Sequence, residues 1–229
     1  KKYKLPKNVK AELRSYQKHG YSWLKFLDES GFGGILADDM GLGKTLQVIT
    51  LLADQIKKEP SLVIVPRSLL FNWAAEIDKF CPDLKYVIHH GSGRAASMDE
   101  LLPINVIITT YGTAAQDVEK FKDFNFNYII LDESQAIKNP DSKRYKAMRL
   151  LQSNNKLAMT GTPIENNTFD LYAQLSFTSP GLLGSKASFK NNFAIPIDNQ
   201  GDQDAAKLLR KLIHPFLLRR TKKQVAKDL

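Results

Sequence analysis

The stretch ADDMGLGKT, residues 37–45, combines residue types that hold phosphate groups. In loops that follow the pattern G-x-x-x-x-G-K-[ST], backbone N–H groups cradle phosphates, the Lys reaches the β and γ phosphates, and the Ser or Thr hydroxyl binds Mg²⁺. Gly43, Lys44 and Thr45 fit this pattern, but Asp38 stands where the first Gly belongs. The segment therefore predicts a phosphate-binding loop that departs from the usual spelling at one position.

The sequence on either side predicts the elements that would position this loop. GGILA, residues 33–37, is typical of a buried strand, and KTLQVITLLADQIKK, residues 44–58, of an amphipathic helix. A strand, a Gly-rich turn and a helix in this order direct the helix N-terminus, with its free N–H groups and positive dipole end, toward an anion. Since Gly41 and Gly43 let the backbone approach phosphates closely, the missing first Gly leaves the predicted geometry intact.

A pair of acids after another predicted strand would complete a hydrolytic site. YIILDE, residues 128–133, ends in Asp132, placed to bind Mg²⁺, and Glu133, placed to orient and deprotonate an attacking water. Paired acids after a strand are also common in plain surface turns. Together with the loop, however, they favour a site for a nucleoside triphosphate.

A third candidate is Gln17, in the segment LRSYQKHGYSWL, residues 13–24. Its side-chain amide offers donors and an acceptor that can read an adenine edge. A surface Gln on an amphipathic helix explains the spacing equally well.

Six short apolar runs alternate with stretches whose apolar residues are three or four positions apart. Strands buried on both faces, with helices between them, form an α/β doubly wound, mostly parallel sheet with helices on both faces. Ligands then bind at the carboxyl ends of the strands. From about residue 164 the pattern changes to helices and irregular segments, so we expect one domain with a helical appendage. The six runs are 33–37, 61–66, 85–90, 105–111, 128–133 and 156–162.

The composition excludes several classes of protein. With 229 residues, 43% of them hydrophobic, the chain is expected to be globular rather than disordered. The single Cys81 excludes a disulfide framework and a Cys-based zinc site, and favours a reducing compartment. No apolar run approaches the roughly 20 residues that a membrane span needs, and the N-terminus lacks the apolar stretch of a signal peptide. We therefore expect a soluble, intracellular protein, and the Lys at position 1 suggests a piece of a longer one.

The net charge of +9 is concentrated at the two ends. Residues 1–10 carry five Lys and no acid, and residues 207–229 carry eight Lys or Arg against one Asp, which leaves residues 11–206 with a net charge of −3. A polyanionic partner would therefore bind through the ends. The alternative is that the ends are solvated tails around a nearly neutral body.

Together these motifs closely resemble the first RecA-like lobe of the Swi/Snf-related helicase-like ATPases, DNA translocases that include chromatin remodellers. The resemblance extends from Leu13 to Leu229, and in this family Asp is the usual residue at position 38. LRSYQ resembles the adenine-reading motif, DDMGLGKT motif I, IVPRSLLFNW motif Ia, ITTYGT motif Ib, LDESQ motif II and MTGTPIENN motif III. DLYAQLSFTSPGLLGS and HPFLLRRTKKQV resemble a helical protrusion, about 164–213, and a return segment, about 214–229, of a single RecA-like P-loop NTPase lobe spanning 1–229.

The resemblance implies ATP and Mg²⁺ as cofactors and gives roles to the matched residues. Glu133 would be the catalytic base, acting with Asp132 and Lys44, and Thr45 and Asp132 would hold Mg²⁺. The nucleotide-binding residues would be Arg14, Gln17, Asp39, Met40, Gly41, Leu42, Gly43, Lys44 and Thr45. The residues beside DNA would be Pro66, Arg67, Ser68, Thr110 and Tyr111, and those coupling the nucleotide site to the DNA face would be Gln135, Thr160, Gly161 and Thr162.

Gln135 departs from the family pattern, which has His at this place in motif II. Both side chains form hydrogen bonds, but only His becomes cationic near neutral pH. The departure therefore bears on the coupling to motif III rather than on hydrolysis by Asp132 and Glu133. In motif Ia, Asn72 and Trp73 are interpreted as packing and loop-bracing residues.

The resemblance implies the ATP-hydrolysing motor lobe of a double-stranded DNA translocase that remodels or displaces DNA-bound proteins. Its partners would be duplex DNA and a second RecA-like lobe of the same protein, which supplies the arginine fingers and is absent from these residues. We therefore expect weak hydrolysis by this lobe alone, a monomer, and no membrane partner. The basic residues Arg219, Arg220, Lys222 and Lys223 of the return segment would face DNA or the second lobe.

Two other functions stay open. The first is a lobe of an RNA helicase. It is disfavoured by the sequences of three motifs, LDESQ, PGLLGS and HPFLLRRT. The second is a non-catalytic, nucleotide-gated module that binds nucleic acid. It is disfavoured because the catalytic set is intact, namely Lys44, Thr45, Asp132 and Glu133. The lack of a long basic low-complexity extension favours the cytoplasm of a bacterium, and a eukaryotic protein would be nuclear.

Overall fold

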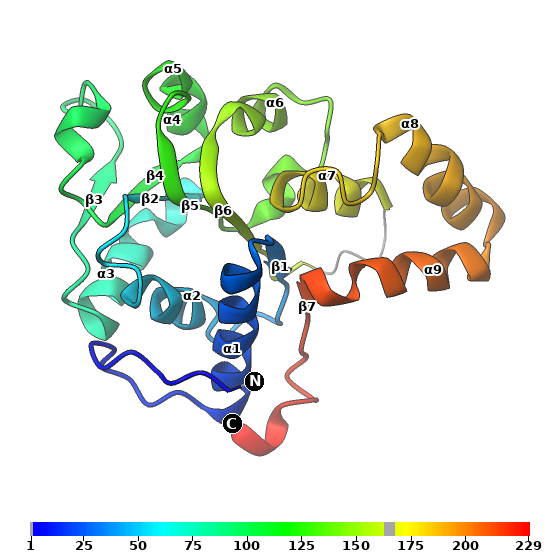
Figure 1. The fold of residues 1–229 in the computed structure, drawn as a ribbon, viewed down its shortest axis with the longest axis horizontal. Coiled ribbons are helices and arrows are strands. Elements are labelled where there is room, and N and C mark those ends of the chain that lie inside the picture. The colour runs from blue at the N-terminus through cyan, green and yellow to red at the C-terminus, as the bar shows by residue number, and fades with distance from the viewer. Residues whose placement is uncertain (1, 163–167) are drawn as a thin grey trace.

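A seven-stranded sheet forms the centre of the structure, a computed structural model that describes residues 2–162 and 168–229 (Figure 1). The strand order is β3-β4-β2-β5-β6-β1-β7, and all neighbouring strands run parallel. This confirms the predicted α/β class. The strands are β1 (Gly34–Leu36), β2 (Ser61–Val65), β3 (Tyr86–His89), β4 (Val106–Thr110), β5 (Asn125–Leu131), β6 (Gln152–Met159) and β7 (Leu217–Leu218).

All six runs predicted as strands are strands. Two of them begin earlier than predicted: β5 and β6 pair from Asn125 opposite Gln152 onward, in stretches where Phe126 is the one apolar residue. The ladder extends there because backbone hydrogen bonds do not depend on the polarity of the side chains. β7 was not predicted, because two residues are too few to show a periodicity.

Helices cover both faces of the sheet, as expected for a doubly wound fold (Figure 1). On one face, α1 (Ser15–Ser30), α2 (Lys44–Ala53) and α3 (Leu70–Phe80) pack in a core that includes the fully buried Trp73. The predicted helix 44–58 is shorter in the structure, because the chain turns at Asp54. The opposite face is covered by α4 (Tyr111–Gln116), α5 (Val118–Phe121), α6 (Lys143–Leu150) and α7 (Thr168–Thr178).

The helical extension lies beside β1 and β7 at one edge of the sheet (Figure 1). It contains α7, α8 (Lys186–Phe189), a π-helical segment (Lys190–Asn199) and α9 (Gln203–Ile213). Their apolar side chains form a third core with Ile35 of β1 and Ala158 of β6. Residues 163–167, which include part of the predicted motif III and the predicted start of the protrusion, lie outside the described residues.

Five neighbouring strands end at the predicted motifs. In the order β4-β2-β5-β6-β1, their carboxyl ends lead into motif Ib, motif Ia, motif II, motif III and the phosphate loop. Because the carboxyl ends of parallel strands meet at one edge of a sheet, motifs that are far apart in the chain meet there. Motif III follows β6 and therefore lies between the phosphate loop and motif II.

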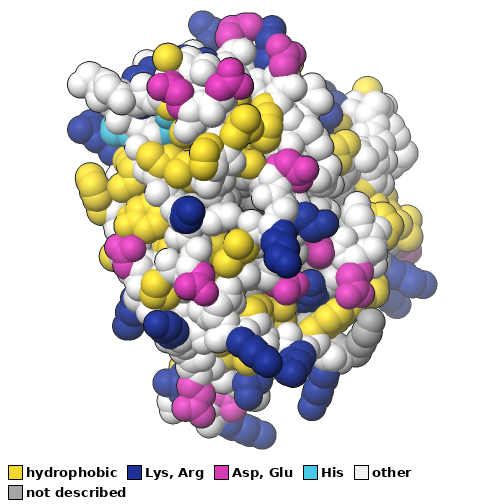
Figure 2. Space-filling model, turned by 60° about the vertical axis from the view of Figure 1, so that its left-hand side comes forward, with side chains coloured by type: hydrophobic (Ala, Val, Ile, Leu, Met, Phe, Trp, Pro, Cys, Tyr) yellow, Lys and Arg dark blue, Asp and Glu magenta, His cyan; other side chains and the backbone are white. Residues whose placement is uncertain are grey.

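The two basic ends both pack against α1. The N–H of Tyr3 donates to Ser22 Oγ at 3.4 Å, and Ser15 Oγ donates to Asp228 Oδ2 at 2.9 Å. Lys and Arg side chains gather over the lower part of the face in Figure 2, at the height at which Figure 1 places both termini. Among the described residues, none of the helices has the length and apolar character needed to cross a membrane.

Candidate functional site

Two glycines shape the loop between β1 and α2. Gly41 and Gly43 have φ angles of +88° and +84°, a region in which a side chain is strained. Gly43 directly precedes α2, so the first backbone N–H groups of this helix are turned toward the loop. A Cβ on Gly43 would also lie 2.5 Å from Gln17 Nε2. Both the backbone conformation and the packing therefore require glycine at this position.

Lys44 is the first residue of α2, at the end of the loop. Its Nζ donates to the carbonyl oxygens of Asp38, at 2.7 Å, and Asp39, at 3.4 Å. Burial lowers the pKa of the Lys44 ammonium, and the nearby carboxylates, including those of Asp132 and Glu133, partly offset this shift. The structure therefore brings the predicted phosphate-binding lysine within electrostatic range of both predicted acids.

Asp132 is held from three directions in a buried position. Trp73 Nε1 donates to Asp132 Oδ2 at 2.8 Å, and the N–H of Glu133 donates to Oδ1 at the same distance. The hydroxyl of Tyr111 donates to the Asp132 carbonyl at 2.7 Å. Burial raises the pKa of the Asp132 carboxyl, while the hydrogen bond from Trp73 opposes the shift. Such an orienting set of partners is typical of a metal ligand.

A chain of hydrogen bonds leads from Glu133 to motif III. Gln135 Nε2 donates to Glu133 Oε2 at 2.6 Å, and Thr160 Oγ1 donates to Gln135 Oε1 at 2.8 Å. Thr160 Oγ1 in turn accepts the N–H of Thr162 at 3.1 Å. A Cβ on Gly161 would lie 3.7 Å from Lys44 Nζ, so this end of the chain lies next to the phosphate loop. The four predicted coupling residues thus lie between the predicted base and the loop, and the amide of Gln135 serves as both donor and acceptor.

Gln17 packs beneath the loop. Its Oε1 accepts the N–H of Arg14 at 2.8 Å, and its Nε2 donates to the carbonyl of Leu42 at 3.2 Å. A side-chain amide has a second N–H and a second lone pair, so these bonds leave capacity for an adenine edge. The Arg14 side chain donates to the carbonyl of Asp228.

Three other predicted nucleotide-binding residues differ in what their side chains contact. The Leu42 side chain is buried against Tyr16 and Val225, and Met40 is 73% exposed. The Asp39 carboxylate accepts hydrogen bonds from Arg219 Nη2 and from the N–H of Lys222. For Leu42 and Asp39, contact with a nucleotide is therefore limited to the backbone, because their side chains are engaged elsewhere.

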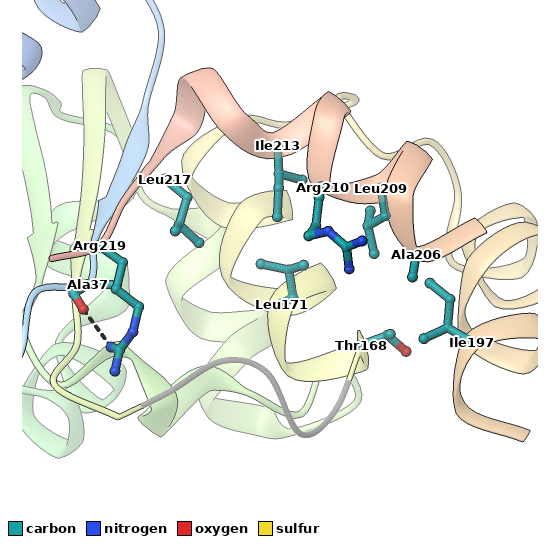
Figure 3. A pocket seen from close by; sticks show the side chains of 10 residues that line it. All are labelled: Ala37, Thr168, Leu171, Ile197, Ala206, Leu209, Arg210, Ile213, Leu217 and Arg219. Carbon is teal, nitrogen blue, oxygen red and sulfur yellow. Dashed lines mark hydrogen bonds between the residues drawn. The ribbon is translucent and has the colours of Figure 1, made fainter. Parts of the chain in front are cut away.

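Arg219 and Arg220, which were predicted to face DNA or the second lobe, extend their side chains to the phosphate loop. Arg219 Nη1 donates to the carbonyl of Ala37 at 2.8 Å, as the dashed line in Figure 3 shows. Arg220 donates to both carboxylate oxygens of Asp38, from Nε at 2.9 Å and from Nη2 at 2.6 Å. The buried Asp38 carboxylate and the half-buried Asp39 carboxylate attract the guanidinium groups of Arg220 and Arg219, respectively. Asp38, the unusual residue of the loop, is thus an arginine acceptor.

The residues predicted beside DNA divide into two groups. Arg67 and Ser68 are exposed after β2, and Pro66 beside them is half-buried. Thr110 and Tyr111 are 6% and 3% exposed. Thr110 accepts the N–H of Thr113 as the N-cap of α4, and the Tyr111 hydroxyl braces Asp132. The side chains of these two residues are therefore turned into the lobe, and a contact with DNA at this position would be limited to their backbone.

Sequence reasoning missed Glu76, a third acid close to the predicted metal site. Its Oε2 is buried and has no hydrogen-bond partner among the described residues. Burial raises the pKa of the Glu76 carboxyl, the Thr45 hydroxyl beside it lowers this pKa, and the Asp132 carboxylate raises it further. The sequence spacing could have indicated Glu76, because Trp73 and Glu76 are three residues apart and share a face of α3. Trp73 packs as predicted, whereas Asn72 is exposed.

The donor set at this point suits Mg²⁺. Oxygen atoms of Thr45, Asp132 and Glu76 lie near one another, and the described residues contain no group of three or more His, Cys, Asp or Glu side chains that would form an all-protein metal cage. Mg²⁺ is usually held by one or two carboxylates together with waters and substrate phosphates. The unpartnered Glu76 oxygen is placed to accept a hydrogen bond from such a water.

An apolar pocket of about 310 Å³ lies apart from this site, between α7, α9 and β7 (Figure 3). Its lining is mostly aliphatic and includes one face of α9, and its charged lining residues are Arg210 and Arg219. The lining residues are Ala37, Thr168, Leu171, Ile197, Ala206, Leu209, Arg210, Ile213, Leu217 and Arg219.

The chain is similar to curated proteins that are described as a helicase/translocase and as a TATA-binding protein-associated factor. The chain is 41% identical over 228 residues to the putative ATP-dependent helicase/translocase YwqA of Bacillus subtilis, covering 96% of this chain and 25% of that protein. It is 39% identical to the TATA-binding protein-associated factor MOT1 of Saccharomyces cerevisiae, covering 100% of this chain and 14% of that protein. The chain thus spans about a quarter or less of these curated relatives.

Solved structures agree with the fold. The structure superimposes on the Sulfolobus solfataricus SWI2/SNF2 ATPase core in complex with dsDNA with a TM-score of 0.91 and 45% identity, covering 99% of this chain and 49% of that chain. The model of the SNF2-related domain matches residues 16–229. The chain therefore belongs to the family of SNF2-related domains.

Proposed function

We propose that this chain is the ATP-binding and ATP-hydrolysing motor lobe of a double-stranded DNA translocase that remodels or displaces DNA-bound proteins. The proposal is carried by one observation: Lys44, Asp132 and Glu133 share one site at the carboxyl ends of the parallel strands β1 and β5, between which only β6 lies. The relatives are described as helicases, translocases and ATPase cores, and the chain covers only part of each of them. A second RecA-like lobe of the same protein would complete the motor.

The residues of the chain divide the hydrolytic work among them. The N–H groups at the start of α2 and the Lys44 ammonium bind the phosphates, and Thr45 and Asp132 hold Mg²⁺, which neutralises phosphate charge when bound. Glu133 orients the attacking water and takes up its proton. Gln135 keeps the Glu133 carboxylate in place through the 2.6 Å hydrogen bond to Oε2. Arg14 and Gln17 lie on the side of the loop where we place the adenine.

DNA would bind at the same edge of the sheet, through residues exposed after β2. Arg67 and Ser68 offer a guanidinium group and a hydroxyl, which suit contacts with phosphate oxygens and carry no base specificity. The solved core from Sulfolobus solfataricus is described in complex with dsDNA, which supports duplex DNA as the partner. The basic ends, both packed on α1, add positive charge to the lobe.

ATP hydrolysis by the full-length protein, measured with duplex DNA, with RNA and without nucleic acid, tests the proposal. We expect duplex DNA to stimulate turnover, Arg67→Ala to reduce this stimulation, and Glu133→Gln to abolish turnover while leaving ATP binding intact. Glu59→Gln serves as the matched control, because Glu59 is an exposed acid just before β2, at the edge of the sheet opposite to the motifs. Stimulation by RNA alone would favour an RNA helicase. Full turnover by Glu133→Gln would refute the assignment of the base and favour a non-catalytic module.

A further inference from the structure

The return segment, residues 214–229, lies directly over the phosphate loop. After β7, the N–H of Asp39 donates to the carbonyl of Arg220 at 3.0 Å, and the N–H of Lys222 donates to Asp39 Oδ2 at 2.9 Å. Further along, the side chain of Val225 is buried against Tyr16 and Leu42. The last residues of the chain therefore contact the loop at several successive points.

The strongest of these contacts joins Asp38 and Arg220. The Asp38 side chain is fully buried, and its two oxygens accept hydrogen bonds from Nε, Nη2 and the backbone N–H of Arg220. A bidentate Arg–carboxylate pair is stronger and more specific in geometry than a single ionic contact. Because an unpaired carboxylate is costly in a buried position, the conformation of the loop at Asp38 depends on Arg220 being in place.

Arg220 also connects the loop to the helices on either side. Its Nη2 donates to Gln47 Oε1 of α2 at 2.8 Å, and its guanidinium group lies 5.4 Å from the centre of the Tyr16 ring of α1. Gln47 Nε2 donates to the carbonyl of Gly43 at 3.1 Å, and the Tyr16 hydroxyl donates to the carbonyl of Leu42 at 2.9 Å. A displacement of Arg220 would thus be transmitted to both residues that precede Lys44.

We propose that Asp38 and Arg220 form a positioning pair that couples nucleotide binding at the phosphate loop to docking of the return segment. In this role Arg220 touches no substrate: it holds the loop in its binding conformation, and a nucleotide on the loop holds the return segment down. This inference rests on the proposed ATP binding. It explains why Asp, rather than Gly, stands at position 38.

Linkage makes the proposal quantitative. If docking of the return segment favours nucleotide binding by some factor, nucleotide binding must favour docking by the same factor. Docking is measurable by hydrogen exchange, because the N–H groups of Arg220 and Lys222 donate to Asp38 and Asp39 only while the segment is docked. Affinity is measurable by titration with a fluorescent, non-hydrolysable ATP analogue and Mg²⁺.

In the chain of residues 1–229, we expect the analogue with Mg²⁺ to slow exchange at Arg220 and Lys222 by about tenfold, within the usual range of coupling between sites. Arg220→Lys keeps the positive charge but cannot form the bidentate pair with the Asp38 carboxylate. We expect it to weaken binding of the analogue by about the same factor and to abolish the nucleotide-dependent protection. Lys227→Ala removes an exposed cation from the same segment, and we expect it to change neither quantity.

A second variant keeps the proposal testable if Arg220→Lys fails to fold. Val225→Ala loosens the return segment from its far end without touching the pair, and we expect a change in the same direction but smaller. Unchanged affinity in a folded Arg220→Lys protein, or exchange at Arg220 and Lys222 that does not respond to the analogue, would overturn the coupling and leave the proposed function standing. No binding of the analogue by the wild-type chain would overturn the proposed function, and the coupling with it.

Discussion

Glu133 adopts a backbone conformation that costs stability. Its φ of +50° and ψ of +54° lie in the left-handed region, and Glu133 is the one non-glycine residue with positive φ among those described. An L-residue in this region costs roughly 1–2 kcal/mol, and such strain is concentrated at functional sites. This conformation directs the Glu133 carboxylate toward Gln135, while the Glu133 N–H donates a hydrogen bond to the Asp132 carboxylate. Strain at this residue therefore positions both acids.

Replacing Glu133 tests whether stability is exchanged for function. Asn tolerates the left-handed region, so we expect Glu133→Asn to raise the free energy of unfolding by about 0.5–1 kcal/mol while abolishing ATP turnover. Glu133→Gln keeps the strain and is the matched control, expected to lose turnover without gaining stability. Urea unfolding measures the difference, and equal stability of the two variants would argue against stored strain.

At the same scale, Glu76 is predicted to support Mg²⁺. Since its Oε2 is buried and unpartnered among the described residues beside Thr45 and Asp132, we expect it to orient a metal-bound water. Loss of such outer partners typically weakens metal affinity about 10- to 100-fold. We expect Glu76→Gln to raise the Mg²⁺ concentration needed for half-maximal binding of an ATP analogue by about tenfold. Glu59→Gln is the control, and an unchanged Mg²⁺ requirement would exclude this role.

At the scale of elements, a buried charge cluster fixes β3 against the α4–α5 turn. Arg94 donates to both oxygens of Asp117, from Nε at 2.8 Å and from Nη2 at 3.1 Å, and Lys120 lies 3.5 Å from Asp117 Oδ1. His89 Nε2 also contacts Asp117, at 2.6 Å. Arg94 and His89 hold the pKa of the Asp117 carboxyl well below its usual value. Burial lowers the pKa of the His89 imidazole, Asp117 opposes this shift, and the nearby Lys120 and Arg94 cations add to it.

This shift predicts a pH dependence of stability. The unfolded chain takes up a proton at His89 near pH 6.5, whereas the folded chain does so only at lower pH. The unfolded state therefore binds more protons in this window, so stability is lost as the pH falls below about 6.5. We expect the stability difference between wild type and His89→Gln to shrink between about pH 7 and 5 in thermal unfolding. His214→Gln, at an exposed position, is the control, and a constant difference for His89→Gln would contradict the prediction.

At the scale of the whole molecule, the phosphate loop and motifs Ia, II and III lie at one edge of one sheet. They therefore belong to a single lobe. In helicase-like motors a second lobe supplies arginine fingers that stabilise the transferring phosphoryl group, worth about 10³- to 10⁵-fold in rate. The solved core that this chain matches is about twice as long, with 49% of it covered. The arrangement is therefore suited to binding ATP and positioning water, and would depend on a partner lobe for fast turnover.

A comparison of two proteins tests this dependence. We expect residues 1–229 to bind ATP with Mg²⁺ but to turn it over at least about 10³-fold more slowly than the full-length protein with duplex DNA. Steady-state ATPase assays at saturating ATP measure the ratio. Robust DNA-stimulated turnover by residues 1–229 would show that the lobe needs no partner.

The sequence by itself determined the fold class and predicted most residues of the candidate nucleotide site. Apolar runs alternating with amphipathic stretches predicted all six of the longer strands, because burial on both faces leaves a strong local signal. Lys44, Thr45, Asp132 and Glu133 were predictable because the chemistry they perform restricts both residue type and position at a strand end. The extension of β5 and β6 into polar residues left no such signal.

Only the tertiary structure decided which residues face one another across the sheet. Asp38 and Arg220 are 182 positions apart and meet because β7 lies beside β1, an arrangement that no periodicity encodes. Tyr111 was predicted at DNA but braces Asp132, since β2, the one strand between β4 and β5, brings the ends of both strands together. Local patterns thus determined the elements and the reactive residues. The order of strands determined their partners, because it is set by packing of the whole chain.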